Sequence, residues 1–210
     1  IDPDNLPEGW RWGKFEELYK ITSGGTPSRT RSDYFTGGNI CWVKSKELDG
    51  GFILDTEEKI TTEAFNSSAA KKLPIHTVLI AMYGATVGEI ATLSIEATCN
   101  QAIAAIIPND EYPYSFAFMF FKMMKDELIN RASGSAQQNI SLVVIKNFEL
   151  SIPPIPLVKM YHNLVKDLFS KIENNLWEIK DLTSISDTLL PKLMSGEIEV
   201  TNPIADEVFS

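Results

Sequence analysis

The sequence predicts an α+β protein in which a globular domain precedes one long C-terminal α-helix. Three observations carry this prediction. Apolar residues recur every three or four positions over residues 157–193, which places them on one stripe of a helix. Short apolar segments of strand length, separated by turn residues, occupy much of the chain before residue 152. Pro153 and Pro154 end the last of these segments and predict a domain boundary there.

The globular domain, residues 1–154, begins with a turn at residues 6–10, after which apolar residues recur at Trp12, Phe15 and Leu18. Five apolar segments, each five to seven residues long, then predict β-strands. The segment at residues 77–82 is the strongest, because nearly every position in it is apolar. The five segments are residues 39–43, 77–82, 89–95, 102–107 and 148–152, with residues 98–101 separating two of them.

Two helices are expected within the domain. Residues 61–72 predict a short helix capped by Thr61 or Thr62. Residues 114–130 predict a longer one, whose Phe and Met residues lie near 3.6-residue spacing and are typical of a packed core. Residues 131–140 are polar and predict a flexible loop.

The C-terminal helix is predicted to be the longest element. No Gly or Pro interrupts residues 157–190, and 34 residues at about 1.5 Å each make a rod of roughly 50 Å. A small domain cannot cover a stripe of that length, and the chain offers no second helix of similar length, so we expect a partner helix. Pro191 predicts a break or kink, and residues 199–210 predict a frayed tail. The stripe comprises Leu157, Tyr161, Leu164, Leu168, Ile172, Leu176, Ile179, Leu182, Ile185, Leu189 and Leu193.

Composition limits the function classes. The net charge is −9, with 14 basic and 19 acidic residues in positions 1–150, which disfavours a protein that binds DNA alone through its phosphates. No apolar run approaches the roughly 18 residues of a membrane span, and we expect a cytoplasmic protein. Cys41 and Cys99 are too few for a disulfide framework.

Enzymatic and metal-binding patterns are not found. His76 and His162 lie far apart, without Cys or acidic neighbours at metal-ligand spacing. The Gly-rich loop at residues 23–29 lacks the Lys and Ser/Thr of a phosphate-binding loop. Residues 152–155 lack the Asn and the aromatic residue of an amino-methyltransferase motif. The sequence therefore predicts no catalytic site, no metal and no cofactor.

Several loops are instead rich in hydrogen-bonding groups. Residues 83–88 follow a buried strand with an aromatic ring, a hydroxyl and two glycines. Lys44, Ser45 and Lys46 follow another strand, and the amides at residues 137–139 can pair with adenine edges. Ordinary turn chemistry explains each loop equally well when it is taken alone.

Taken in order, these segments resemble the specificity subunit of type I restriction-modification systems. The resemblance covers nearly the whole chain and depends on seven motifs in sequence rather than on any one of them. They are residues 6–10 (LPEGW), 23–29 (SGGTPSR), Trp42-Val43 before Ser45 and residues 48–50 (LDG), 83–88 (YGATVG), 99–102 (CNQA), Pro153-Pro154, and 189–198 (LLPKLMSGEI).

The resemblance implies a target recognition domain with a twisted, mostly antiparallel sheet (residues 1–154), then a conserved long helix for dimerisation and spacing (residues 155–198) and a tail (residues 199–210). Family members hold two copies of this unit, whose helices pack antiparallel and set the gap between the halves of a bipartite DNA site. This sequence has one copy and therefore resembles a half subunit. Two copies would pair through the helical stripe, Leu157 to Leu189, in a two-fold arrangement.

The resemblance also implies the partners: double-stranded DNA, the methyltransferase subunits and, indirectly, the restriction subunit. Those subunits would supply basic surface that this acidic chain lacks, so that its own contacts serve mainly to read sequence. Arg and Lys would contact phosphate or guanine, and the amides adenine. The expected DNA-binding residues are Thr26, Ser28, Arg29, Arg31, Lys44, Ser45, Lys46, Tyr83, Thr86, Gln137, Gln138 and Asn139.

Two other hypotheses stay open at this stage. The chain could be the recognition fragment of a single-chain DNA methyltransferase, although it lacks the catalytic and cofactor motifs. It could also be an adaptor that uses the helix to join proteins while the domain does not contact DNA.

Overall fold

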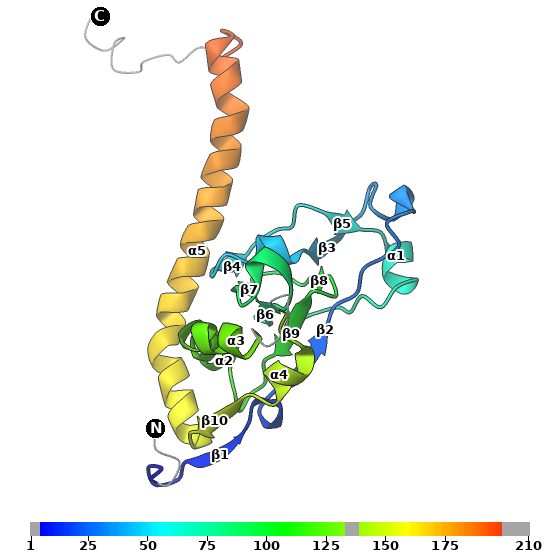
Figure 1. The fold of residues 1–210 in the computed structure, drawn as a ribbon. Coiled ribbons are helices and arrows are strands. Elements are labelled where there is room, and N and C mark those ends of the chain that lie inside the picture. Colours follow the sequence, from blue (N-terminus) through cyan, green and yellow to red (C-terminus); the bar gives the residue numbers. More distant parts are fainter. Residues whose placement is uncertain (1–4, 133–138, 199–210) are drawn as a thin grey trace, which may run out of the picture. The chain divides into compact units, whose positions relative to one another are not determined.

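The structure is a computed structural model that describes residues 5–132 and 139–198 (Figure 1). The chain divides into two compact units, Ile1–Phe169 and Ser170–Ser210, and the division falls inside the C-terminal helix. The described residues of the first unit combine short helices with sheets in which antiparallel pairs predominate, as the sequence predicts. The boundary at residue 154 between a recognition domain and a helical region stays a prediction.

A five-stranded sheet forms the centre of the first unit, in the order β2-β9-β6-β7-β4. Its pairs are antiparallel except for β4 and β7, which run parallel. Three of the strands coincide with predicted segments, and β2 and β4 were not predicted. The strands are β2 (Lys20–Ser23), β9 (Ile103–Ile107), β6 (Val78–Ala81), β7 (Ile90–Leu93) and β4 (Phe52–Ile53).

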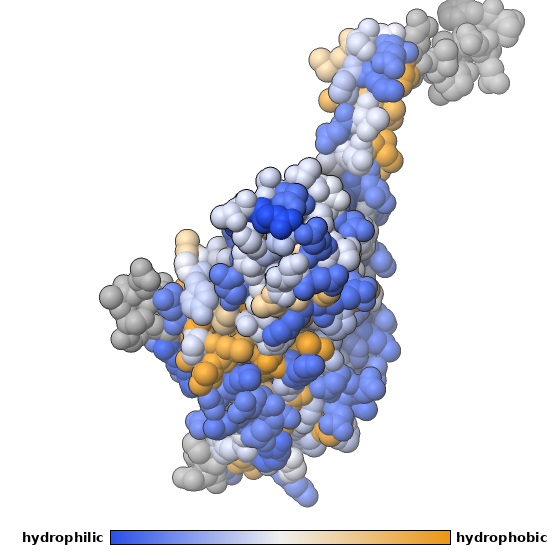
Figure 2. Space-filling model, turned by 90° about the vertical axis from the view of Figure 1, so that its right-hand side faces the viewer, coloured by the Kyte–Doolittle hydropathy of each residue, from blue (hydrophilic) through white to orange (hydrophobic). Residues whose placement is uncertain are grey.

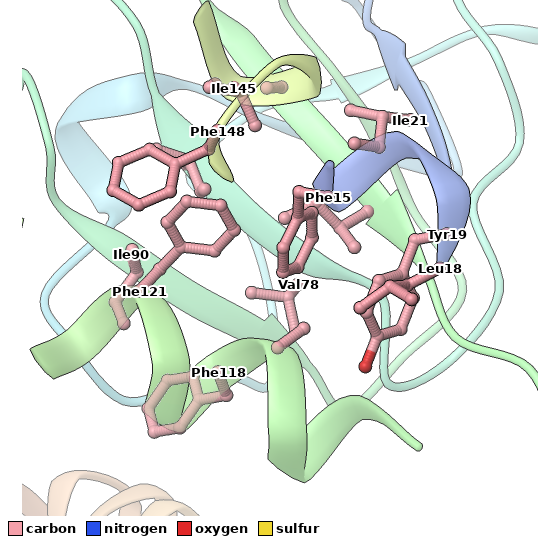
Figure 3. Close-up of a cluster of buried hydrophobic side chains, with 14 of the residues drawn as sticks. Phe15, Leu18, Tyr19, Ile21, Val78, Ile90, Phe118, Phe121, Ile145 and Phe148 are labelled. Atoms are coloured by element: carbon pink, nitrogen blue, oxygen red, sulfur yellow. The ribbon is translucent and has the colours of Figure 1, made fainter. Parts of the chain in front are cut away.

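The central sheet is buried on both faces. Val78 and Ile80 of β6 point into one cluster, and Leu79 and Ala81 into another, because successive side chains of a strand alternate between faces. The first cluster includes a group of rings in which Phe15, Phe121 and Phe148 lie side by side (Figure 3), with the Phe15 and Phe121 centroids 4.6 Å apart. Burial on both faces explains why residues 77–82 are nearly all apolar.

Two smaller sheets complete the strands of the first unit. In one, β3 (Ile40–Val43) pairs antiparallel with β5 (Lys59–Ile60) and parallel with β8 (Thr98–Cys99). In the other, β1 (Arg11–Lys14) pairs antiparallel with β10 (Glu149–Ile152), which brings the start of the described chain next to the start of the long helix. Residues 98–101, expected only to separate strands, therefore contain β8.

The helices are α1 (Thr62–Asn66), α2 (Tyr114–Met123), α3 (Lys125–Ala132), α4 (Leu142–Lys146) and α5 (Ile155–Met194). As Figure 1 shows, α2 and α3 follow each other closely, and α5 is far longer than the others.

Three of the helical predictions and one loop prediction need correction. The helix expected at residues 61–72 is capped by Thr61, one of the two expected caps, but it ends at Asn66, and a turn follows at Ser67 and Ser68. The helix expected at residues 114–130 divides at Met124 into α2 and α3, and Leu128 of α3 is buried in the core. Of the loop expected at residues 131–140, Arg131 and Ala132 belong to α3 and residues 133–138 lie outside the described residues. The unpredicted helix α4 follows.

Of the break or kink expected at Pro191, the break does not occur. The long helix continues through this residue and ends at Met194. The fixed φ of proline suits a helix, so near the end of α5 the ring removes one backbone hydrogen bond without ending the helix.

Candidate nucleic-acid interface

Several polar segments of the first unit meet where β2 and β6 end and β9 begins. They are residues 23–31, 43–47, 82–88, 99–102 and 139–140, which we call the loop cluster. Backbone hydrogen bonds join them, so segments that are far apart in sequence form one region. The bonds are Gly24 N–H to Ile103 C=O (3.3 Å), Asn100 N–H to Val43 C=O (2.9 Å), Met82 N–H to Ala102 C=O (2.7 Å) and Ile140 N–H to Met82 C=O (2.8 Å).

The Gly-rich segment is fixed by backbone and ring contacts. The Gly25 N–H donates to the Cys99 carbonyl (2.9 Å), and the Gly25 carbonyl accepts from the indole Nε1 of Trp42 (3.0 Å). Trp42 is itself buried beside Ile60 and Ala64. The rigid segment places Thr26, which is half-buried, and Ser28, whose hydroxyl lies 2.8 Å from that of Thr30, at the start of the cluster.

Lys44 lies inside a network of carboxylates. Only 14% of its side chain is exposed, and its Nζ donates to Glu57 (2.8 Å) and Glu58 (2.7 Å). Lys46 donates to the same Glu57 oxygen at 2.6 Å. The Glu47 side chain accepts from the Lys44 backbone N–H (2.6 Å), which fixes the turn Ser45–Glu47. The predicted Lys-Ser-Lys loop is therefore tied to a segment 13 residues further along the chain.

The network also sets the protonation of its members. Hydrogen bonds from Lys44 and then Lys46 lower the pKa of the Glu57 carboxyl to about 2. Hydrogen bonds from Arg29 and then Lys44 lower the pKa of Glu58. Partial burial lowers the pKa of the Lys44 ammonium, but the hydrogen bonds to Glu57 and Glu58 outweigh burial and the net pKa is raised. All three groups stay charged at neutral pH.

The two arginines of the segment 23–31 differ in their surroundings. The Arg29 guanidinium lies on the rings of Phe35 and Trp42, 4.3 and 4.7 Å from their centroids, and its Nη1 donates to Glu58. Arg31 instead lies over Tyr34 and donates from Nε and Nη2 to Asp33 and from Nη2 to Glu63.

Tyr83 and Asn139 are brought together. They form an antiparallel bridge, so the loop after β6 and the segment before α4 lie side by side. The Tyr83 side chain and Asn139 are exposed, whereas Thr86 is half-buried. Gln137 and Gln138 lie outside the described residues.

Sequence reasoning missed the acidic and aromatic residues of this region. Glu57 and Glu58 accept from three of the predicted basic side chains, and Phe35 supports Arg29. The only signal is that the Glu57-Glu58 pair directly precedes a short strand, and nothing in the sequence links it to residue 44. Lys71, which donates to Thr22 Oγ1 and to the Ser23 carbonyl, was likewise not predicted.

The long helix has two apolar faces in its first four turns. Val158 and Phe169 are buried in the core of the first unit, and Ile155 and Val165 are partly buried against it. The predicted stripe lies about 100° away around the helix, because its members precede these residues by one position. Part of this stripe is visible as orange side chains in Figure 2. Leu164, Leu168, Ile172, Ile179, Leu182, Ile185 and Leu189 are exposed, and Leu157, Tyr161 and Leu176 are half-buried.

The histidines lie at the contact between α2 and α5. The Ser115 hydroxyl is 2.9 Å from Nδ1 of His162, and His76 stacks on Tyr114 at 4.3 Å between centroids. Among residues 5–132 and 139–198, His, Cys, Asp and Glu side chains form no group that could hold a metal ion. No helix in the described part of the chain is long and apolar enough to cross a membrane.

Comparison with protein families gives a match along most of the chain. The family model for the type I restriction modification DNA specificity domain matches residues 7–181. This range includes the loop cluster and the first 27 residues of α5.

Curated relatives agree with this match. The type I restriction enzyme HindI specificity subunit of Haemophilus influenzae is 29% identical over 197 residues, which are 92% of this chain and 42% of that protein. The MjaIX specificity subunit of Methanocaldococcus jannaschii is 27% identical over 199 residues, which are 93% and 46% of the two chains. This chain therefore spans less than half the length of these relatives.

Solved structures share the fold. The HsdS subunit from Thermoanaerobacter tengcongensis is 17% identical with a TM-score of 0.56, and covers 92% of this chain and 47% of its own. The S subunit of the type I restriction-modification system from M. genitalium is 18% identical with a TM-score of 0.64, over 93% and 47% of the chains. Since the family match takes in the strands, the loop cluster and much of the helix, this protein belongs to the family of type I restriction-modification DNA specificity domains.

Proposed function

We propose that this chain is a DNA sequence-recognition module of a type I restriction-modification complex and that it reads one half of a bipartite target. The observation that carries the proposal is the loop cluster, in which segments rich in donors and acceptors meet at one end of the central sheet. Relatives named as type I specificity subunits support it.

Within the loop cluster, hydroxyls, amides and cations would contact DNA together. Tyr83, Thr86 and Asn139 come from two paired segments, and Thr26, Ser28, Arg29, Ser45 and Lys46 come from the loops beside them. Arg31 does not enter this set, because its Nε and Nη2 are bonded to carboxylates. Lys44 would act indirectly, by holding the carboxylates that neighbour Arg29 and Lys46.

The exposed stripe of α5 would bind the same stripe of a second copy in an antiparallel coiled coil. Its apolar side chains extend over most of the helix, and a stripe of that length is stabilised by removing it from water. A two-fold pair would present two identical recognition domains to DNA.

The complex would supply the remaining functions. We infer that the chain docks methyltransferase subunits, and through them the restriction subunit, in the cytoplasm. It would need no metal or cofactor and would perform no catalysis itself. Basic surface on those partners would offset the net charge of −9.

Fluorescence anisotropy of labelled duplexes tests the recognition function. The chain is mixed with its modification subunit, and a pool of random duplexes is selected for binding in low salt. The proposal predicts saturable binding and an enriched sequence in the selected pool. A flat signal would favour the adaptor hypothesis, and S-adenosylmethionine bound to the purified chain would favour the single-chain methyltransferase.

A further inference from the structure

The basic side chains of the loop cluster differ in how many of their donors are already used. A guanidinium has five N–H donors in a planar fork, and an ammonium has three. Intramolecular carboxylates occupy some of these donors, and only the remainder can bind DNA without breaking an existing bond. Lys46 donates to Glu57 from a side chain that is 61% exposed. Arg29, Arg31 and Lys44 have more contacts within the protein, and their remaining donors can be compared.

Arg29 keeps one edge of its guanidinium available. Its Nη1 donates to Oε2 of Glu58 at 2.5 Å, and among residues 5–132 and 139–198 no acceptor is bonded to its Nε or Nη2. The side chain is 49% exposed, although two aromatic rings support its plane. It is therefore both fixed and accessible.

Arg31 and Lys44 have the opposite arrangement. Arg31 uses Nε and Nη2, the same edge that Arg29 leaves open, to bind Asp33 and Glu63. Lys44 is mostly buried and bonds two carboxylates. In Arg31 and Lys44, carboxylates of the protein therefore occupy the donors that correspond to the open edge of Arg29.

The support of Arg29 is specific to a guanidinium. A planar cation stacks on aromatic faces, whereas an ammonium is a compact point charge that cannot keep the same orientation. Trp42 is fixed by its own bond to the Gly25 carbonyl, and Glu58 is held from its other oxygen by Lys44. Fixing a long side chain before binding reduces the entropy lost when the complex forms.

We propose that Arg29 is the positioned DNA donor of the loop cluster: its open Nε–Nη2 edge takes a pair of acceptors on DNA, and Glu58, Phe35 and Trp42 position it. The acceptors are either the two free oxygens of a backbone phosphate or O6 and N7 of a guanine, since a guanidinium fork fits both. This inference rests on the proposed recognition function.

Arg29→Lys and Arg31→Lys form a matched pair of variants. Both keep the net charge, and both lose a planar fork in the same loop. Each is assayed in complex with the modification subunit, first on the random duplex pool and then on the sequence that the wild type selects. Arg29→Lys should weaken binding to that sequence by about tenfold or more, and Arg31→Lys should match the wild type within about twofold.

The two possible acceptors are distinguished by a panel of single base-pair changes and by salt titration. A guanine contact predicts that Arg29→Lys loses discrimination at one G·C pair. A phosphate contact predicts equal weakening on every sequence, and a salt slope reduced by about one in Arg29→Ala. Glu58→Ala should weaken binding as well, and Glu58→Gln, which keeps an acceptor for Arg29, should restore part of it.

Equal behaviour of Arg29→Lys and Arg31→Lys, in a wild type that does select a sequence, would overturn the inference and leave the proposed function standing. A wild type that binds no duplex would overturn the proposed function, and this inference with it. Thermal unfolding of each variant separates loss of folding from loss of contact.

Discussion

Gly24 occupies a point where two backbone segments touch. A Cβ atom on this residue would lie 2.0 Å from the Cys99 carbonyl oxygen and 2.5 Å from that of Asn100. Because the two backbone segments lie so close together, the Gly24 N–H reaches the Ile103 carbonyl, and this bond aligns the loop with the start of β9. The glycine in the Ser-Gly-Gly-Thr-Pro motif is thus required by backbone contact.

Gly24→Ala should therefore destabilise the domain by about 3 kcal/mol or more, since the obstacle is backbone and cannot rotate away. Gly51→Ala is the matched control, because its Cβ would meet only the Asp49 side chain, at 3.2 Å. Urea denaturation followed by tryptophan fluorescence measures both. Equal midpoints for the two variants would show that the contact at Gly24 is not tight in solution.

His162 joins α5 to α2 in a setting that disfavours its charge. Burial lowers its pKa, with smaller effects from the charges of Lys166 and His76. A histidine with a lowered folded pKa stabilises the protein fully above its unfolded pKa of about 6.5, and this contribution is lost as the pH falls toward the folded value.

Acidification from about pH 7.5 to about pH 5.5 should therefore lower the melting temperature of the wild type more than that of His162→Gln. Glutamine keeps a group that can bond Ser115 but does not titrate. Calorimetry across this range gives the comparison. Parallel pH profiles would exclude His162 as the source of the dependence.

At the scale of elements, the first part of α5 has two apolar faces, of which one packs on its own domain and the other is exposed. Phe169 contacts Phe52, Phe118 and Tyr114 in the core of the first unit, with ring centroids 5.7 to 6.1 Å apart. Leu168, the preceding residue, is 62% exposed. Neighbouring positions thus serve different purposes: one anchors the helix on its own domain, and the other belongs to the stripe proposed to bind a second copy.

Phe169→Ala should cost about 3–5 kcal/mol of unfolding free energy, because it removes a buried ring from this cluster. Leu168→Ala should change the unfolding of the dilute chain by about 0.5 kcal/mol or less. Denaturation at low protein concentration compares the two variants. Similar losses would mean that Leu168 is buried in the folded domain as well.

The spacing of the stripe bears on how two helices would pair. Leu157 to Leu193 covers 36 residues in ten steps, an average of 3.6, which keeps the stripe straight along an ordinary helix. A symmetric antiparallel pair centred on residue 175 would bring Leu157 against Leu193, Tyr161 against Leu189 and Leu168 against Leu182. We therefore expect the proposed coiled coil to supercoil less than one with a strict seven-residue repeat.

Replacing Leu168 and Leu176 together by Asp should dissociate this pair, because carboxylates would be buried without partners. Ser170→Asp with Asn174→Asp is the charge-matched control on the opposite face of the helix. Light scattering at tens of micromolar gives the mass of each form. If the leucine variant stays dimeric while the control does too, the dimer contact lies elsewhere.

At the scale of the whole molecule, the sequence predicts best what is continuous along the chain. The buried strand β6, the ends of β3 and β10 and the long helix follow from local apolar patterns bounded by Gly, Pro or polar residues. The two-residue strands β4, β5 and β8 could not be predicted, because each exists only through its neighbours in the sheets.

The candidate site likewise combines features that the local sequence predicts with features that depend on contacts between distant segments. The loops that carry Lys44, Tyr83 and Asn139 stand out in sequence, but their meeting at one sheet end is set by strand order. The pairing of Lys44 and Arg29 with Glu58 depends on contacts between segments 14 and 29 residues apart, for which local pattern gives no signal. The second apolar face of α5 could not be predicted for a different reason. It has the same helical spacing as the exposed stripe, and because it is shorter, the longer stripe dominates the pattern.

Sequencing of modified bases in DNA from a host that carries this chain and its modification subunit tests the central claim most directly. If two copies read DNA as a symmetric pair, the methylated sites will share a bipartite motif whose halves are identical and inverted, separated by a fixed gap. Methylation with no shared motif, or with two different halves, would contradict it.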